Sequence, residues 1–221
     1  MSGFDKGGVQ ARVTVVVSPR ERFGMAKESL ESIYATAGIA FDLVYIDGRS
    51  PKHVSDWLDQ AAPAKGFKVI RLDRFVTPNE ARNLGAAAAR TEYVTFIDND
   101  VIGSEGWLAA LVKAGDETGA EIVSPLVCEG VPLHSRVHQA TGTFARDKAA
   151  FFAAPYGERE LIDVMTFHST PLDQVRASST ARRPTLANSI ASWCAALCWR
   201  RWVRCRSMRK CMPPRNISIS A

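Results

Sequence analysis

Residues 93–101 read YVTFIDNDV, and the rest of the predicted fold is arranged around them. Its apolar and β-branched residues predict a buried strand that ends in the acidic turn Asp98-Asn99-Asp100. In an open α/β sheet, ligands bind in the crevice at the carboxyl ends of the strands. Two carboxylates at that place are hard oxygen ligands, suited to Mg²⁺ or Mn²⁺ on a phosphorylated substrate. Taken alone, the triplet is equally compatible with an acidic turn that caps the next helix.

Strands and helices alternate on both sides of this stretch. Apolar, β-branched runs predict strands at 13–17, 41–46, 66–72 and 121–127, and apolar residues at helical spacing predict helices at 22–37, 78–90 and 104–118. A further helix follows Ser50-Pro51, with Ser50 as its expected N-cap. The small residues of 78–90 predict a helix that lies close to a sheet. This alternation predicts an α/β fold with a mainly parallel central sheet.

The composition is that of a globular protein with an unusual end. Of 221 residues, 46% are hydrophobic and 23% charged, which is ordinary for a folded domain. No run of about 18 apolar residues predicts a transmembrane helix. The N-terminal sequence MSGFDKGGVQAR contains no apolar signal core. We therefore expect a cytoplasmic protein, or one peripheral to the inner face of the membrane.

The net charge of +5 hides a division of the chain. Residues 176–221 carry ten Lys and Arg and no Asp or Glu, which leaves −5 for the other residues, and they hold four of the five cysteines. The cysteine spacing has no CxxC pair, so it does not match a zinc module. A basic, Trp-containing arm could instead bind nucleic acid or an anionic surface. A non-enzymatic α/β protein with such a tail is the alternative function.

Polar residues follow three of the predicted strands. The carboxyl ends of parallel strands share one edge of a sheet, so these residues should converge on one crevice. Early in the 78–90 helix, Arg82 and Asn83 could add a phosphate or base contact, although Arg82 could equally be a solvated helix charge. The residues at the three strand ends are Pro19, Arg20 and Glu21 after the first, Asp47 after the second, and Asp98 and Asp100 after the fourth.

Several nucleotide-binding and catalytic classes lack their motifs here. The turn after the first strand, SPRERFG, contains one late glycine and not the glycine-rich dinucleotide fingerprint. The sequence contains neither a GxxxxGK[ST] phosphate loop nor a GxSxG nucleophile elbow. A nucleotidyltransferase, which shares the α/β build and metal chemistry, stays open as a further alternative.

Three segments occur in the order VTVVVSPRERF, VYIDGRSP and PNEARNLGAAAARTEYVTFIDNDVIGSEGWLAALV. Together they resemble the family 2 glycosyltransferases of the GT-A fold, over about residues 12–145. The resemblance implies a three-layer sandwich and an inverting transfer from a nucleotide-diphosphate sugar, assisted by Mn²⁺ or Mg²⁺. Asp98-Asn99-Asp100 matches the DxD motif of the family, which makes Asp98 and Asp100 the expected metal ligands. The expected nucleotide-sugar contacts are Pro19, Arg20, Glu21, Asp47, Arg82, Asn83 and Asp98.

The general base that activates the acceptor hydroxyl is not assigned by the sequence. His134 and His138 lie in VPLHSRVHQATG, which resembles a family segment, and are weak candidates that could equally be structural or surface histidines. Their spacing of four would suit a metal on a helix, but Pro132 argues against a helix there. Members of the family supply the base from a later acidic motif, whereas no acid follows Asp173 in this chain.

The end of the chain is interpreted as an out-of-frame product. Back-translation of 189–220, read one base earlier, can yield family-like segments such as FHCVLVRRAVLEAVGPL and ATAEHIDIS. We therefore expect four regions: a disordered leader at 1–11, a nucleotide-sugar-binding domain at 12–145, a remnant of the acceptor side at 146–175, and a frameshifted basic tail at 176–221, with the fold truncated or disordered there. The acceptor is unspecified: a saccharide, a lipid or a small molecule.

Overall fold

The computed structural model describes residues 10–19, 22–144, 163–178 and 198–200. Two compact units divide the chain, the first formed by 1–123 with 197–221 and the second by 124–196. The predicted contacts Arg20 and Glu21, the leader 1–9 and most of the tail lie outside the described residues. In the part of the chain that the structure describes, no helix has the length and apolarity to cross a membrane.

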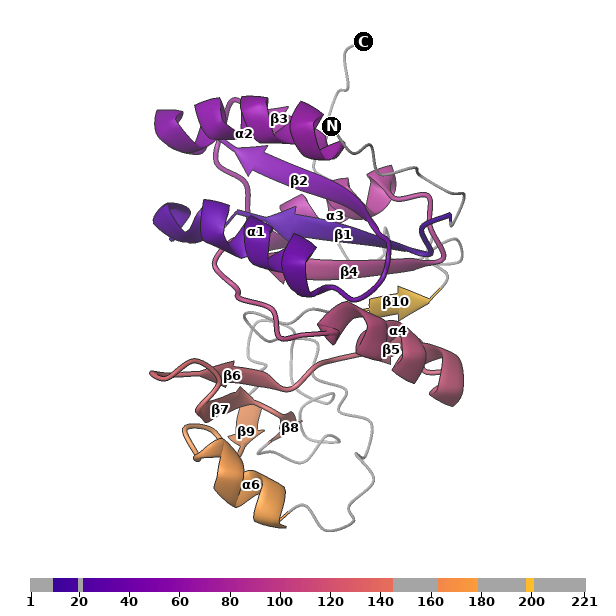
Figure 1. The fold of residues 1–221 in the computed structure, drawn as a ribbon, viewed down its shortest axis with the longest axis vertical. Coiled ribbons are helices and arrows are strands. Elements are labelled where there is room, and N and C mark those ends of the chain that lie inside the picture. Colours follow the sequence, from indigo (N-terminus) through magenta and orange to yellow (C-terminus); the bar gives the residue numbers. More distant parts are fainter. Residues whose placement is uncertain (1–9, 20–21, 145–162, 179–197, 201–221) are drawn as a thin grey trace, which may run out of the picture. The chain divides into compact units, whose positions relative to one another are not determined.

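A six-stranded sheet forms the centre of the first unit (Figure 1). Strand β1 pairs in parallel with both β2 and β4, and β2 pairs in parallel with β3, while β10 runs antiparallel between β4 and β5. The predicted α/β architecture with a mainly parallel sheet is confirmed. In spatial order the strands are β3 (Lys68–Leu72), β2 (Asp42–Gly48), β1 (Val13–Ser18), β4 (Tyr93–Asp98), β10 (Cys198–Arg200) and β5 (Ile122–Val123).

Helices cover both faces of this sheet, which produces the three layers expected of a GT-A-type sandwich (Figure 1). One face carries α3 (Pro78–Ala88), which packs on β1 and β2. The other face carries α1 (Ala26–Thr36), preceded by the short helix η1 (Phe23–Met25), together with α2 (Lys52–Lys65) and α4 (Trp107–Thr118). A backbone hydrogen bond of 2.7 Å from Gly106 N to Thr36 O joins α4 to α1.

The predicted close approach of 78–90 to the sheet is confirmed at Gly85. A Cβ atom added to this residue would lie 2.1 Å from Cγ1 of Val16, which is fully buried in β1. Ala81 and Ala86 of the same helix are buried against the same apolar cluster, which also contains Val44 and Phe96. Any side chain larger than hydrogen at position 85 would push the helix from the sheet.

Two local predictions are wrong. The expected strand 121–127 is interrupted: β5 ends at Val123, and β6 (Val127–Glu129) belongs to another sheet. Pro125 lies in this break, and its missing N–H cannot continue a strand ladder. Pro51, not Ser50, is the N-cap of α2, and its carbonyl accepts from Val54 N at 2.9 Å.

Among its described residues, the second unit contains short strands and one helix. Strand β6 pairs antiparallel with β7 (Arg136–Gln139), and β8 (Thr141–Phe144) pairs antiparallel with β9 (Asp163–Thr166). Helix α6 (Leu172–Ser178) follows. The segment between β9 and α6 lies along β7, with Val137 N donating to Thr170 O and Ser169 N to Val137 O.

Candidate functional site

The carboxyl ends of β2, β1 and β4 bring the predicted acidic residues to one edge of the sheet. Ser18 at the end of β1 is in register with Asp98 at the end of β4, and Asp47 at the end of β2 is in register with Arg71 of β3. Because β1 lies between β2 and β4, Asp47 and Asp98 are two strand spacings apart, roughly 10 Å. The site is therefore a row of polar groups across adjacent strands.

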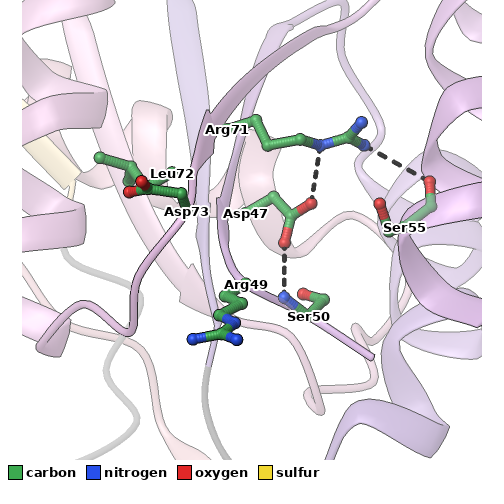
Figure 2. Close-up of a pocket in the computed structure, with 7 residues that line it drawn as sticks. All are labelled: Asp47, Arg49, Ser50, Ser55, Arg71, Leu72 and Asp73. Carbon is green, nitrogen blue, oxygen red and sulfur yellow. Dashed lines mark hydrogen bonds and ion pairs between the residues drawn. The ribbon is translucent and has the colours of Figure 1, made fainter. Parts of the chain in front are cut away.

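Asp47 is held at this edge by hydrogen bonds to both carboxylate oxygens. It is 1% exposed, and its Oδ1 accepts from Ser50 N while its Oδ2 accepts from Arg71 Nε, each at 2.9 Å (Figure 2). Arg71 also donates to Asp59 Oδ1 at 2.9 Å. A carboxylate has about four lone-pair directions. Asp47 therefore keeps acceptor capacity for a ligand hydroxyl or N–H after these two bonds.

A depression of about 400 Å³ lies beside Asp47 (Figure 2). Ser50 Oγ, which lines it, is buried and has no hydrogen-bond partner among the described residues. A buried hydroxyl without a hydrogen bond lowers the stability of the fold, unless a ligand or a water molecule bonds to it. Arg49 adopts a left-handed backbone conformation with φ of 62°. The other lining residues are Asp47, Ser55, Arg71, Leu72 and Asp73.

Tyr45 is a buried neutral phenol beneath this end of β2. Burial, and then the charge of Asp47, raise the pKa of Tyr45 well above its ordinary value. Its hydroxyl has no hydrogen-bond partner within the described part of the chain. The phenol therefore stays protonated, and the charge at this edge belongs to Asp47 and Arg71.

Asp98 faces a cation from α3. It is 2% exposed, and its Oδ1 lies 3.6 Å from the Arg82 guanidinium. Arg82 is only 21% exposed at its side chain, so it is not the solvated helix charge of the alternative interpretation. Its Nε is buried without a hydrogen-bond partner among the residues described, as is Ser18 Oγ nearby in register with Asp98. These unsatisfied groups suit an additional polar ligand such as an anion.

Asp100 is the more accessible carboxylate of the Asp98-Asn99-Asp100 turn. Its side chain is 18% exposed, and Arg22 Nε lies 4.0 Å from Oδ2, at the outer limit of an ion pair. Hard carboxylate oxygens at a solvent-reachable edge suit Mg²⁺ or Mn²⁺. The residues present therefore fit a divalent metal, with Asp100 open to solvent and Asp98 anchored behind it.

The other predicted site residues lie apart from Asp47, Asp98 and Asp100 in burial or in their place in the chain. Pro19 is buried directly after β1, and Asn83 is exposed on α3 beside Arg82. His134 and His138 belong to the second unit, where His134 has a φ of 62° and His138 lies on β7. His138 Nδ1 is 3.0 Å from Glu129 Oε2. A general-base role for either histidine stays a prediction.

Three residues at this edge were not among the predicted site residues: Arg71, Ser50 and Arg49. Arg71 lies in the predicted strand 66–72, which also contains the exposed Lys68, so no local pattern distinguishes Arg71 from a surface charge. Its position opposite Asp47 depends on the register between β2 and β3. Ser50 was interpreted as a helix cap, and Arg49 carried no pattern of its own.

Curated relatives are known for part of the chain. The succinoglycan biosynthesis protein ExoO of Rhizobium meliloti (strain 1021) is 30% identical over 110 residues, which is 50% of this chain and 31% of ExoO. The pre-mycofactocin glycosyltransferase of Mycobacterium tuberculosis (strain ATCC 25618 / H37Rv) is 28% identical over 148 residues, 67% of this chain and 29% of that protein. The alignments thus span about a third of these relatives.

Solved structures with similarity to this chain include a mannosyltransferase and S. aureus TarS. The mannosyltransferase PcManGT from Pyrobaculum calidifontis, in complex with GDP-Man and Mn²⁺, has a TM-score of 0.48 at 22% identity, covering 55% of this chain and 36% of that one. S. aureus TarS 1–349 in complex with UDP-GlcNAc has a TM-score of 0.47 at 21% identity, covering 59% and 39%. The sequence profile described as Glycosyl transferase family 2 matches residues 14–175. Because that match covers most of the chain, this protein belongs to glycosyl transferase family 2.

Proposed function

We propose that this chain binds a nucleotide-diphosphate sugar at the edge formed by Asp47, Asp98 and Asp100, as the donor for an inverting, metal-assisted glycosyl transfer. The observation that carries the proposal is the set of carboxylates at the carboxyl ends of β2 and β4, on one edge of the parallel sheet, each beside an arginine. Family membership supports the reaction class. The relative from M. tuberculosis is named as a glycosyltransferase, and a similar solved structure contains UDP-GlcNAc.

The nucleoside half of the donor is assigned to the depression beside Asp47. Ser50 Oγ supplies an unsatisfied hydroxyl there, and Asp47 retains acceptor lone pairs for a ribose hydroxyl or a base N–H. Arg71 holds the Asp47 carboxylate in place, which makes Arg71 a positioning residue. Pro19, Arg20 and Glu21 at the end of β1, together with Asn83, are proposed to add contacts to the same ligand.

The diphosphate half is assigned to the end of β4. Asp98 and Asp100 would hold the Mn²⁺ or Mg²⁺, which when bound neutralises negative charge that grows on the departing diphosphate. Arg82 adds a fixed positive charge and an unsatisfied Nε donor. An arginine that already contacts Asp98 keeps the like charges of Asp98 and Asp100 compatible before the ligand arrives.

The binding proposal is tested by calorimetry of UDP and GDP with Mn²⁺ on the parent chain and on Asp100→Asn. We expect affinity to fall at least tenfold in Asp100→Asn and the dependence on Mn²⁺ to disappear. The matched control is Asp42→Asn, which removes an exposed carboxylate from the opposite, amino end of β2. Equal binding by the parent chain and Asp100→Asn would overturn the metal assignment.

Ser50→Ala tests the nucleoside end independently. Loss of one neutral hydrogen bond corresponds to about 0.5–1.5 kcal/mol, or roughly 2- to 12-fold weaker binding. Thr118→Val is a suitable control, because the Thr118 hydroxyl bonds to its own helix at the far end of α4. If Ser50→Ala binds both nucleotides as the parent does, the depression is not the nucleoside pocket.

Donor binding and sugar transfer are proposed to be separable in this chain. Transfer requires a general base near the acceptor, and no Asp or Glu follows Asp173 in the sequence. We expect metal-dependent nucleotide binding together with little or no release of nucleoside diphosphate from donor in a coupled assay. Multiple turnovers with any saccharide, lipid or small-molecule acceptor would show that a base is present and would contradict this part of the proposal.

A further inference from the structure

The second unit contains a cluster of metal-ligating groups that donor binding does not use. Glu129 on β6, His138 on β7 and His168 in the turn after β9 each offer one ligand atom, and these three atoms lie within 4.8 Å of one another. The residues are 9 and 30 positions apart in sequence, so only the fold brings them together. We propose that Glu129, His138 and His168 form a binding site for a divalent transition-metal ion, best matched by Zn²⁺.

Hydrogen bonds orient His168 as a ligand. Its Nδ1 lies 2.9 Å from the backbone carbonyl oxygen of His138. A carbonyl oxygen only accepts, so Nδ1 carries the proton and Nε2 of the neutral ring keeps a lone pair. This is the arrangement of metal-binding histidines, which donate their second ring nitrogen to a carbonyl or carboxylate.

His138 and Glu129 are linked in the same way. His138 Nδ1 is 3.0 Å from Glu129 Oε2, and Ser169 Oγ donates to Glu129 Oε1 at 3.3 Å. Glu129 thus orients His138, and its ligand atom lies within 4.8 Å of that of His168. Carboxylate oxygen and imidazole nitrogen are both ligands that Zn²⁺ accepts. The two imidazole rings meet edge-on, with centroids 5.5 Å apart and planes at 67°. Edge-on rings can direct nitrogen lone pairs toward a common point.

The backbone of β7 is irregular at this place. Val127 pairs with Gln139 but the next residue, Cys128, pairs with Val137, so His138 is the extra residue of a β-bulge. Bulges redirect a side chain and occur often beside functional sites. Residues on both sides of His168, Phe167 and Ser169, have positive φ values of 64° and 57°. These conformations are strained for non-glycine residues, so the turn that positions His168 lowers the stability of the folded state locally.

The donor types select the ion class. Imidazole nitrogen suits Zn²⁺ and neighbouring transition metals, whereas Mg²⁺ and Ca²⁺ prefer oxygen ligands only. Tetrahedral Zn²⁺ bonds of about 2.0–2.2 Å place ligand atoms about 3.4 Å apart, so the three atoms, which lie within 4.8 Å of one another, would have to approach by up to about 1.4 Å through side-chain rotation. The side chains of His138 and Glu129 are 29% and 40% exposed, so an ion can reach them from solution. Three ligands leave a fourth position for water.

The ion would fasten the turn after β9 onto the β6–β7 hairpin. Arg136 already donates to Ser169 O at 2.8 Å, and Leu172 N to Ser135 O at 2.9 Å. A ligand bound only by the folded state raises stability by mass action. Zn²⁺ should therefore raise the thermal unfolding midpoint of the chain, in addition to binding.

The test uses the full chain, stripped of metal with EDTA and dialysed, and titrated with Zn²⁺ in competition with a chromophoric chelator. We expect a site whose affinity falls at least tenfold in His168→Ala and in His138→Ala, and whose thermal shift disappears with it. His134→Ala is the matched control, because this histidine lies in the same hairpin outside the cluster. Since His168 is exposed, its replacement should leave the far-ultraviolet circular dichroism unchanged, and His168→Gln provides a second variant of similar size.

Two other sets of ligands must be separated from the cluster. Replacement of the four tail cysteines 194, 198, 205 and 211 by serine removes the thiolates, and Asp100→Asn removes the strand-end carboxylate. The proposal expects both variants to retain the Zn²⁺ affinity of the parent. Equal affinity in His168→Ala and the parent, or loss of the site in the cysteine-free or Asp100→Asn chain, would overturn it.

Discussion

Replacing Gly85 by alanine tests how closely α3 lies on the sheet and, with it, how Arg82 reaches Asp98. The added Cβ would lie 2.1 Å from Val16 Cγ1 and 2.9 Å from Cγ2, whereas ordinary contacts begin at 3.4 Å. The shortfall is about 1.3 Å (3.4 minus 2.1) against a side chain that is fully buried. Neither Val16 nor α3 can relieve such a clash without moving.

Two effects oppose one another in this variant. Alanine in place of glycine stabilises a helix interior by about 1 kcal/mol. Overpacking a close-packed core costs about 1–3 kcal/mol, sometimes more, and a contact of 2.1 Å belongs at the upper end. We therefore expect Gly85→Ala to lower the free energy of unfolding by about 2 kcal/mol. Because Arg82 lies one helical turn before Gly85, displaced packing should also weaken its contact with Asp98 and reduce nucleotide affinity.

Urea unfolding followed by tryptophan fluorescence measures the loss of stability. Calorimetry with UDP and Mn²⁺ measures the loss of nucleotide affinity. Two controls separate packing from propensity. Ala87→Gly, on the exposed side of α3, should lose about 1 kcal/mol from propensity alone. Gly115→Ala in α4 meets the Tyr93 ring at 3.1 Å, so the helix gain should nearly offset a mild clash. A Gly85→Ala chain as stable as its parent would refute the close approach of α3 to β1.

Three further outcomes are expected. Thr77→Ala should destabilise the chain by about 1 kcal/mol, because Thr77 Oγ1 caps α3 through Glu80 N; unchanged urea stability would show that the cap contributes nothing. Arg12→Met should cost about 1 kcal/mol at low salt and less at high salt, since Arg12 bridges Glu92 and Asp116 at half-exposed positions; a loss independent of salt would contradict an ionic origin. Burial, and then a nearby glutamate, raise the pKa of Tyr34 to about 12. Its contribution to stability should be complete below pH 10 and disappear as the pH rises through 12, and a spectrophotometric titration midpoint near 10 would contradict the burial of this ring.

Local sequence patterns predicted most of the first unit. The run VTVVV and the stretch YVTFID became β1 and β4, fully buried on both faces, because continuous β-branched and aromatic runs suit a covered parallel strand. Gly119 ends α4 in a left-handed conformation, which glycine adopts without the steric cost of a Cβ atom. The break at Pro125 was not predicted, because the apolar residues on both sides form a pattern typical of one continuous strand. The lack of an N–H at a single proline does not alter that pattern.

The pairings within the site were not predictable from the chain in the same way. Asp47, Asp98 and Asp100 could be proposed as a group because the edge of a parallel sheet is a general rule. Arg71 could not, because its role depends on which strand lies beside β2 and in which register. The sequence was equally compatible with a solvated Arg82 and with an Arg82 at the site. The close packing at Gly85 fixes the position of α3 and brings Arg82 to 3.6 Å from Asp98.

The order of strands and helices and the acidic turn that ends β4 follow from local sequence, because backbone preference and hydrophobic period are properties of neighbouring residues. Which side chains contact one another depends on the tertiary structure. It placed Arg71 on Asp47, Arg82 on Asp98, and His168 beside His138 and Glu129. These contacts depend on strand register, on a β-bulge and on a turn that runs back along β7. All three features are fixed by packing between segments far apart in the chain.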